Sequence, residues 1–116
     1  MTDVRQILND FLNGVGGIQA NDPSFVEAFM GYQDQSFKEN ALSTKVRELI
    51  GVGIGCYNRC QYCIVFHVYS AYKAGATREE ILDAAKTAIA FGGGPSMAYS
   101  ATVLLAAVNE FENEFK

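Results

Sequence analysis

Residues 43–67, with the sequence STKVRELIGVGIGCYNRCQYCIVFH, carry the clearest signals of the fold. Ser43 is a typical helix N-cap, and the apolar residues that follow it recur at helical spacing. They form one expected inner face, made of Val46, Leu49, Ile50, Gly53 and Ile54. A second helix is expected from about Cys60 to Ala74, because Gly75 is suited to the residue after a helix end.

Glycine alternates with valine and isoleucine in the middle of this stretch, from Leu49 to Tyr57. Such alternation is also typical of a β-strand. Each glycine inside a helix costs about 1 kcal/mol relative to alanine, so these glycines need a reason. We expect the close approach of another helix backbone to supply it. The string lacks the spacing of a dinucleotide-binding loop, and no later acidic residue completes one.

The rest of the chain also predicts helix after helix. Helical spacing of apolar residues begins at Val4, and the glycines at 14, 16 and 17 are expected to end that first helix. Asp22-Pro23 predicts the cap and first residue of a second helix that runs toward Phe37.

Further along, Thr77 and Glu80 have the spacing of a capping box. Gly92–Pro95 predicts a hinge into a last helix, whose apolar side runs from Met97 to Phe111. No linker or repeat divides the chain, so we predict one all-α domain over residues 1–116, a bundle of about six helices.

Composition narrows the possible partners. The chain has 116 residues, a formal net charge of -4 and a pI near 4.8. An acidic chain without a basic stripe is not expected to bind nucleic acid or an anionic membrane surface. The chain contains no run of 18 or more apolar residues, so no membrane span is predicted. Residues 1–10 do not resemble a secretory signal. We therefore expect a cytoplasmic protein.

The candidate chemistry lies at Cys60 and Cys63, which form a C-x-x-C, with the only histidine, His67, four residues later. Two thiols at this spacing can cycle between dithiol and disulfide, and the start of a helix favours thiolate over thiol. Cys63 and His67 share a helix face. Glu48, on the preceding helix, could orient the imidazole or move its proton if the two helices touch.

The third cysteine, Cys56, leaves other chemistries open. Cys56, Cys60, Cys63 and His67 are a possible zinc set, although ligands within twelve helical residues would hardly close a tetrahedron. The C-x3-C-x2-C string also matches radical S-adenosylmethionine enzymes, whose barrel a short helical chain cannot build. A third alternative is a helical assembly whose dithiol is inert. Cys56 itself is expected to be a small core or interface residue.

Taken together, these residues resemble a known family. Glu48, the Cys60-Gln61-Tyr62-Cys63 motif and His67, followed by Ala74-Gly75-Ala76-Thr77, are similar to the AhpD-like (alkylhydroperoxidase D-like) branch of the carboxymuconolactone decarboxylase family. The resemblance is strongest over residues 41–90. It implies an all-α subunit that assembles into homotrimers or homohexamers. The many apolar helix faces, more than a small monomer can bury, independently favour an oligomer.

The resemblance implies a thiol-dependent antioxidant oxidoreductase of alkylhydroperoxidase or peroxiredoxin type. We expect no bound metal or other cofactor. Cys63 would attack a hydroperoxide, Cys60 would resolve the sulfenic acid as a disulfide, and Glu48 and His67 would relay protons. A thiol donor of unknown identity would reduce the disulfide. Tyr62 stands where the better-known peroxidases of the family have a second histidine, and tyrosine is a poor base near neutral pH. A disulfide reductase without peroxidase activity is therefore the alternative within the family.

Overall fold

The computed structural model describes residues 2–116, and all regular structure in that part of the chain is helical. The helices are α1 (Val4–Asn21), α2 (Pro23–Ser36), α3 (Thr44–Asn58), α4 (Gln61–Lys73), α5 (Arg78–Tyr99), the π-helical turn η1 (Ser100–Leu104) and α6 (Leu105–Phe111). The last three follow one another without a loop, so the helices of this part of the chain form five separate runs. The prediction of an all-α fold is confirmed.

The prediction that glycines end the first helix is wrong. Gly14, Gly16 and Gly17 lie inside α1, which continues to Asn21. Glycine propensity is a weak preference that a long helix can absorb, whereas a proline restricts the backbone of the residue before it. Asp22, which precedes Pro23, has φ -146° and ψ 79°, and this non-helical residue ends α1 and caps α2.

The other predicted helix ends are confirmed. The Ser43 hydroxyl accepts a hydrogen bond from the Val46 N–H at 3.1 Å at the start of α3. Thr77 and Glu80 form the expected capping box at the start of α5. Gly75 has the positive φ of 96° that ends α4, and Gly93, with φ 66° and ψ -144°, kinks α5 just before Pro95. These local signals fix where the chain turns.

The core is formed where α3 and α4 pack against each other and against the C-terminal helices. Its fully buried side chains include Val52, Ile64, Val65, Ile81 and Phe111. Leu49 to Tyr57 is helical, so the strand alternative is wrong. A Cβ on Gly55 would lie 3.1 Å from the backbone nitrogen of Ile64, which confirms the close helix approach expected there.

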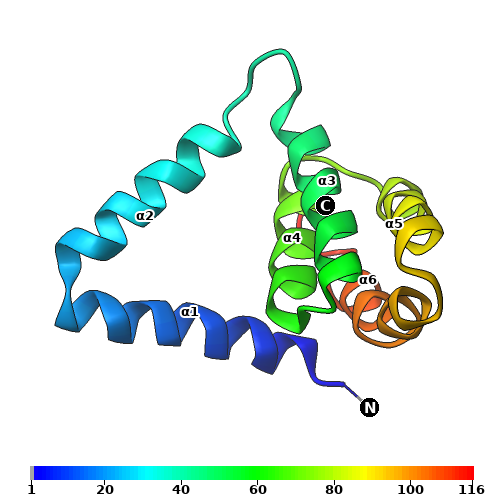
Figure 1. Cartoon of the computed structure of the whole chain (residues 1–116), viewed down its shortest axis with the longest axis horizontal. Coiled ribbons are helices and arrows are strands. Elements are labelled where there is room, and N and C mark those ends of the chain that lie inside the picture. Colours follow the sequence, from blue (N-terminus) through cyan, green and yellow to red (C-terminus); the bar gives the residue numbers. More distant parts are fainter. Residues whose placement is uncertain (1) are drawn as a thin grey trace.

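Helices α1 and α2 form an arm, residues 4–36, which joins this core through Val4 and Leu8 of α1 and projects away from it beyond them (Figure 1). Helix α2 packs mainly against α1, and Val26 is its one buried residue. The first turn of α1 is tied to the C-terminal end of the chain, because the Arg5 guanidinium contacts Glu110 at 2.6 Å and Glu114 at 2.7 Å. The arm is thus anchored at the start of α1, and most of α2 is uncovered.

The long run Arg78–Phe111 is apolar and long enough to cross a membrane, by length and composition alone. Its most apolar window has a mean hydropathy of 1.2, and core helices of soluble proteins meet the same criterion. The kink at Gly93 interrupts the run, and Ile81 and Phe111 are core residues. That the protein acts away from membranes stays a prediction.

Candidate active site

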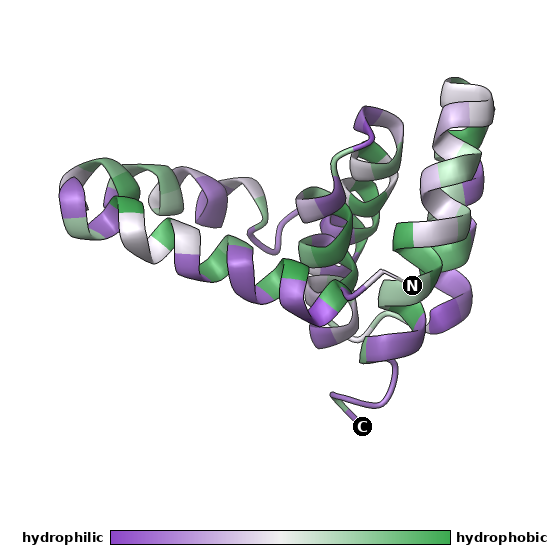
Figure 2. Ribbon diagram, turned by 90° about the horizontal axis from the view of Figure 1, so that it is seen from below, coloured by the Kyte–Doolittle hydropathy of each residue, from purple (hydrophilic) through white to green (hydrophobic). Residues whose placement is uncertain are grey.

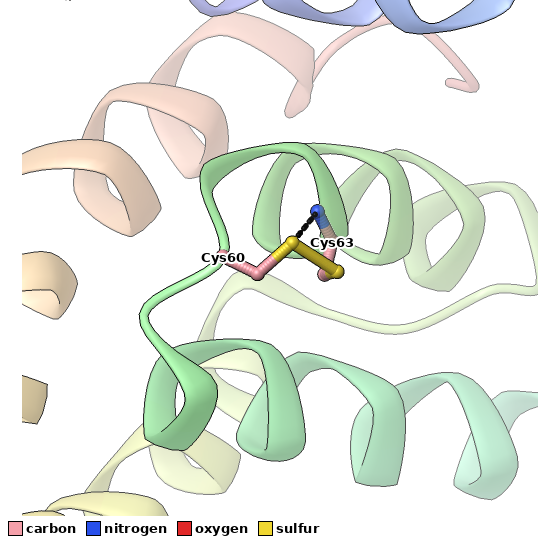
Figure 3. Close-up of a disulfide and its surroundings, with 2 residues drawn as sticks. All are labelled: Cys60 and Cys63. Carbon is pink, nitrogen blue, oxygen red and sulfur yellow. Dashed lines mark hydrogen bonds between the residues drawn. A yellow bond between two sulfur atoms is a disulfide. The ribbon is translucent and has the colours of Figure 1, made fainter.

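Cys60 and Cys63 meet at the start of α4, where they are joined by a disulfide with a Cα–Cα distance of 5.3 Å (Figure 3). The left-handed residue Arg59, with φ 56°, ends α3 and turns the chain so that Cys60 becomes the N-cap of α4. The Cys60 sulfur accepts a hydrogen bond from the Cys63 N–H at 3.2 Å. Because a helix N-terminus carries partial positive charge, this position stabilises a Cys60 thiolate once the disulfide is reduced.

Glu48 and His67 form the second part of the site. A carboxylate oxygen of Glu48, on α3, lies 2.7 Å from Nδ1 of His67, on α4. Glu48 is only 8 % exposed, so its carboxylate needs this partner inside the protein. When Nδ1 carries a proton and donates it to Glu48, Nε2 is left with a lone pair that can accept another proton. In this arrangement the imidazole can accept a proton at Nε2 while Glu48 holds Nδ1.

Three further residues hold the imidazole in place. A Cβ on Gly51 would lie 2.9 Å from Cγ, 2.9 Å from Nδ1 and 3.1 Å from Cδ2 of His67. The near equality of these distances puts Gly51 over the face of the ring, where no larger residue fits. Phe37 stacks on the ring with centroids 5.3 Å apart and an interplanar angle of 16°. Phe66 meets it edge-on at 5.4 Å.

Sequence reasoning did not single out Phe37 or Phe66, and it gave Gly51 the wrong neighbour. Gly51 was expected to face a helix backbone, but it faces a side chain instead. The signal in the sequence was the set of three glycines inside a predicted helix. It indicated a close contact on α3 but did not identify His67 as the neighbour. Phe37 lies at the end of α2, and nothing in its local sequence connects it with a residue 30 positions later.

The two halves of the site share α4. Cys63 and His67 are four residues apart on this helix, so their side chains project from the same face. Both are partly buried. Tyr62, between the cysteines, points to the surface, with 43 % of it exposed. The arrangement places a sulfur of the disulfide and the imidazole on one side of α4, with the Glu48 carboxylate on the preceding helix, α3.

Cys56 lies apart from this chemistry. It is fully buried in the core, and burial raises the pKa of its thiol. Within residues 2–116, no group of three or more His, Cys, Asp or Glu side chains is gathered closely enough to hold a metal ion. Cys56 therefore sits as the small core residue that the sequence predicted, and the four residues weighed as zinc ligands do not converge.

Comparison with known proteins gives the family. Residues 23–106 match the carboxymuconolactone decarboxylase family. The chain belongs to the carboxymuconolactone decarboxylase family. The sequence resemblance to its AhpD-like branch is confirmed, and the matched residues include Glu48, both site cysteines and His67.

Relatives and solved structures cover most of the chain. A carboxymuconolactone decarboxylase family protein of Legionella pneumophila, lpg0406 in its apo form, superposes with a TM-score of 0.90 at 32 % identity, covering 95 % of this chain and 97 % of its own. An uncharacterized protein of Cupriavidus necator is 29 % identical over 89 % of this chain and 91 % of its own length. The family protein TM1620 of Thermotoga maritima, for which a role in antioxidative response has been suggested, shares the fold with a TM-score of 0.73 at 20 % identity over 94 % of this chain and 96 % of its own.

Proposed function

We propose that this protein is a thiol-dependent antioxidant oxidoreductase that reduces hydroperoxides through Cys60 and Cys63. The observation that carries the proposal is the Cys60–Cys63 disulfide at the start of α4, on the helix that also bears the Glu48-bound His67. A disulfide at this spacing is one oxidation state of a redox-active dithiol, and a positioned base supplies the proton transfer that its cycling needs. The decarboxylase members of the family generally lack the cysteine pair, so lactone decarboxylation is not proposed.

In the reduced protein, His67 Nε2 takes the proton of the Cys63 thiol while Glu48 holds Nδ1–H. The Cys63 thiolate attacks the terminal oxygen of the hydroperoxide, the O–O bond breaks, and the alcohol leaves with a proton from His67. Cys63 is now a sulfenic acid. The Cys60 thiol gives up its proton, and the thiolate, stabilised by the helix N-terminus, attacks that sulfur. The S–S bond forms as the S–O bond breaks, and the leaving hydroxide takes up the proton that Cys60 released and departs as water. The dithiol has lost two electrons and the peroxide has gained them.

Return to the dithiol needs a thiol electron donor, which is part of the proposal. A donor thiolate attacks Cys63, and Cys60 leaves as the thiolate that its N-cap position stabilises. A second donor thiol then releases Cys63, so one donor dithiol is oxidised for each disulfide reduced. We propose no metal or other cofactor in this cycle, a cytoplasmic location, and a homotrimer or homohexamer as the working form, because the family resemblance and the uncovered apolar helix faces point that way.

A non-peroxidase disulfide reductase is the second candidate. Tyr62 favours it, because this position lacks the second imidazole of the better-known family peroxidases and its side chain faces solvent. Such an enzyme would use the same dithiol on a partner's disulfide, with Glu48 and His67 protonating the leaving thiolate. The two candidates differ in the oxidant alone, so a hydroperoxide and a small-molecule disulfide can be compared directly on one protein.

Thiol titration before and after one equivalent of hydrogen peroxide, with peptide mapping, tests the proposal. We expect rapid loss of two thiols to a Cys60–Cys63 bridge. Cys63→Ser should abolish this loss, whereas Cys60→Ser should leave a sulfenic acid on Cys63 that a dimedone reagent labels. Cys56→Ala is the matched control and should lose two thiols at the wild-type rate. Unchanged oxidation in Cys63→Ser would sink the assignment, and oxidation only by the disulfide would favour the second candidate.

A further inference from the structure

Helix α2 carries an apolar face that nothing in its own chain covers. Phe25, Phe29 and Tyr32 follow one another at helical spacing, and all three are largely exposed. Figure 2 shows apolar segments recurring along the arm, well away from the core. A helix of 14 residues is marginal alone in water and draws its stability from tertiary packing, yet Val26 is the one residue that α2 buries. The exposed face of α2 therefore needs a partner.

A matching apolar groove lies between α3 and α5 and has a volume of about 560 Å³. Val46, Ile50, Ile54 and Tyr57 line it from α3, and Ala88 and Phe91 line it from α5. These α3 residues are spaced at four, four and three positions, so they form one stripe along the helix. The four α3 side chains are more than a third exposed, and Phe91 is 79 % exposed. We call this surface the α3/α5 groove.

The arm cannot fill the groove of its own chain without leaving its place. In Figure 1 the arm lies on one side of α3 and α4, and α5 lies on the other. Arg5 fixes the arm's base to Glu110 and Glu114, and Phe37 at its far end stacks on His67. Both ends of the arm are thus held on the side away from the groove. The apolar face of α2 and the α3/α5 groove of one chain therefore cannot meet. A second copy of the chain can bring its α2 face to this groove.

The surface area of the chain supports this partner. A compact monomer of 12.6 kDa is expected to expose about 6200 Å², from the scaling of surface with mass. This chain exposes 7055 Å². The excess, about 850 Å², is close to the roughly 800 Å² that each partner buries in a stable protein–protein interface. The excess is therefore about one partner's share of such a contact.

We propose that the apolar face of α2 docks in the α3/α5 groove of a second copy of this chain, an inference that rests on the assembly proposed above. From Val46 to Tyr57 the groove is about 16 Å long, and the face from Phe25 to Tyr32 is about 10 Å long, at 1.5 Å per residue. The face therefore fits within the groove in the helix-in-groove mode. Phe37 directly follows the arm and stacks on His67, so docking of the arm also holds this ring in place beside the imidazole.

Light scattering on the full chain tests this docking with three variants. Phe29→Asp removes the arm's centre, Ile54→Asp removes the groove's centre, and Gln35→Asp adds the same charge to an exposed polar position of α2. We expect the wild type and Gln35→Asp to assemble and the other two to run as monomers with unchanged helical circular dichroism. Mixed in equal amounts, Phe29→Asp and Ile54→Asp should form a pair, because one keeps an intact groove and the other an intact arm.

The outcomes separate this inference from the assembly itself. A wild type that stays monomeric at every concentration overturns both, and then the groove has another occupant or none. Assembly that survives Phe29→Asp or Ile54→Asp overturns the docking alone. The docking alone is also overturned if the mixture stays monomeric at the highest concentration at which each variant alone is a monomer. Contacts between two arms or between two grooves predict that result. None of these readouts depends on the thiol chemistry.

Discussion

Replacing Gly51 with alanine should displace His67 and slow the thiol chemistry. The new Cβ would lie 2.9 Å from Cγ and Nδ1 of the imidazole, whereas comfortable contacts between such atoms are about 3.5–4.0 Å. The ring must therefore move by about 0.5–1 Å, which disturbs the 2.7 Å contact with Glu48. A misplacement of about 1 Å in a catalytic group can cost about 100-fold in rate. We expect a 10- to 100-fold lower rate of peroxide-dependent thiol oxidation.

Stability should change much less than activity in this variant. Overpacking costs about 1–3 kcal/mol, and replacing a helical glycine with alanine returns about 1 kcal/mol. The net loss of about 0–2 kcal/mol leaves the chain folded. Gly16→Ala is the control, because Gly16 is also inside a helix but has open space around it. It should gain up to about 1 kcal/mol and keep the wild-type rate.

Stopped-flow thiol oxidation measures the rate, and His67→Ala shows whether the effect passes through the imidazole. If Gly51→Ala acts by moving His67, adding it to His67→Ala should lower the rate no further, because the two changes remove one function. A Gly51→Ala protein with the wild-type rate, or a double variant whose losses multiply, would show that Gly51 does not act through the position of His67.

Three further predictions concern groups outside the dithiol. In the fully reduced native protein, two thiols should react with a thiol reagent at once. Cys56 should react only on unfolding, because it is buried and burial raises the pKa of its thiol. Immediate reaction of all three thiols would contradict this. Burial raises the pKa of Tyr72 to about 12, so the unfolded chain ionises first and stability should fall by about 2–3 kcal/mol as pH rises from about 10 toward 12. Tyr72→Phe should lack that fall in alkaline denaturant titrations, although it loses the 2.9 Å hydrogen bond to the Val108 carbonyl. The Thr77 N–H and then Lys45 hold the pKa of Glu80 below its usual range, so their contribution should be lost as pH falls through the folded-state pKa, and melting curves of Glu80→Gln should lack this acid sensitivity.

Local sequence signals placed most helix ends correctly. Ser43, Thr77 and Gly75 act through their own backbone and nearest neighbours, so the structure repeats what the sequence predicted. The end of α1 was misplaced because glycine propensity was given more weight than the proline at position 23. A long helix can continue through glycines that each cost about 1 kcal/mol relative to alanine, whereas it cannot continue past the steric restriction on the residue before proline.

The candidate site was predictable in part for the same reason. Cys60, Cys63 and His67 lie on one short segment, and helical spacing alone puts Cys63 and His67 on one face. Glu48 was a candidate whose contact depended on how α3 meets α4, and the structure supplies that contact. Phe37 could not be found, because its stacking on His67 depends on the path of α2 and the following loop.

The all-helical chain, the dithiol at a helix start and the histidine one turn later were predictable from the sequence, since they follow from spacing along one helix. The side chains that surround the imidazole and the helix faces that remain uncovered were not predictable in this way. Both depend on the packing of helices distant in sequence: Gly51 makes room for the His67 ring, and α2 projects from the core with its apolar face exposed. Local periodicity identifies an apolar face, but the surface that covers it is set by where the chain goes next.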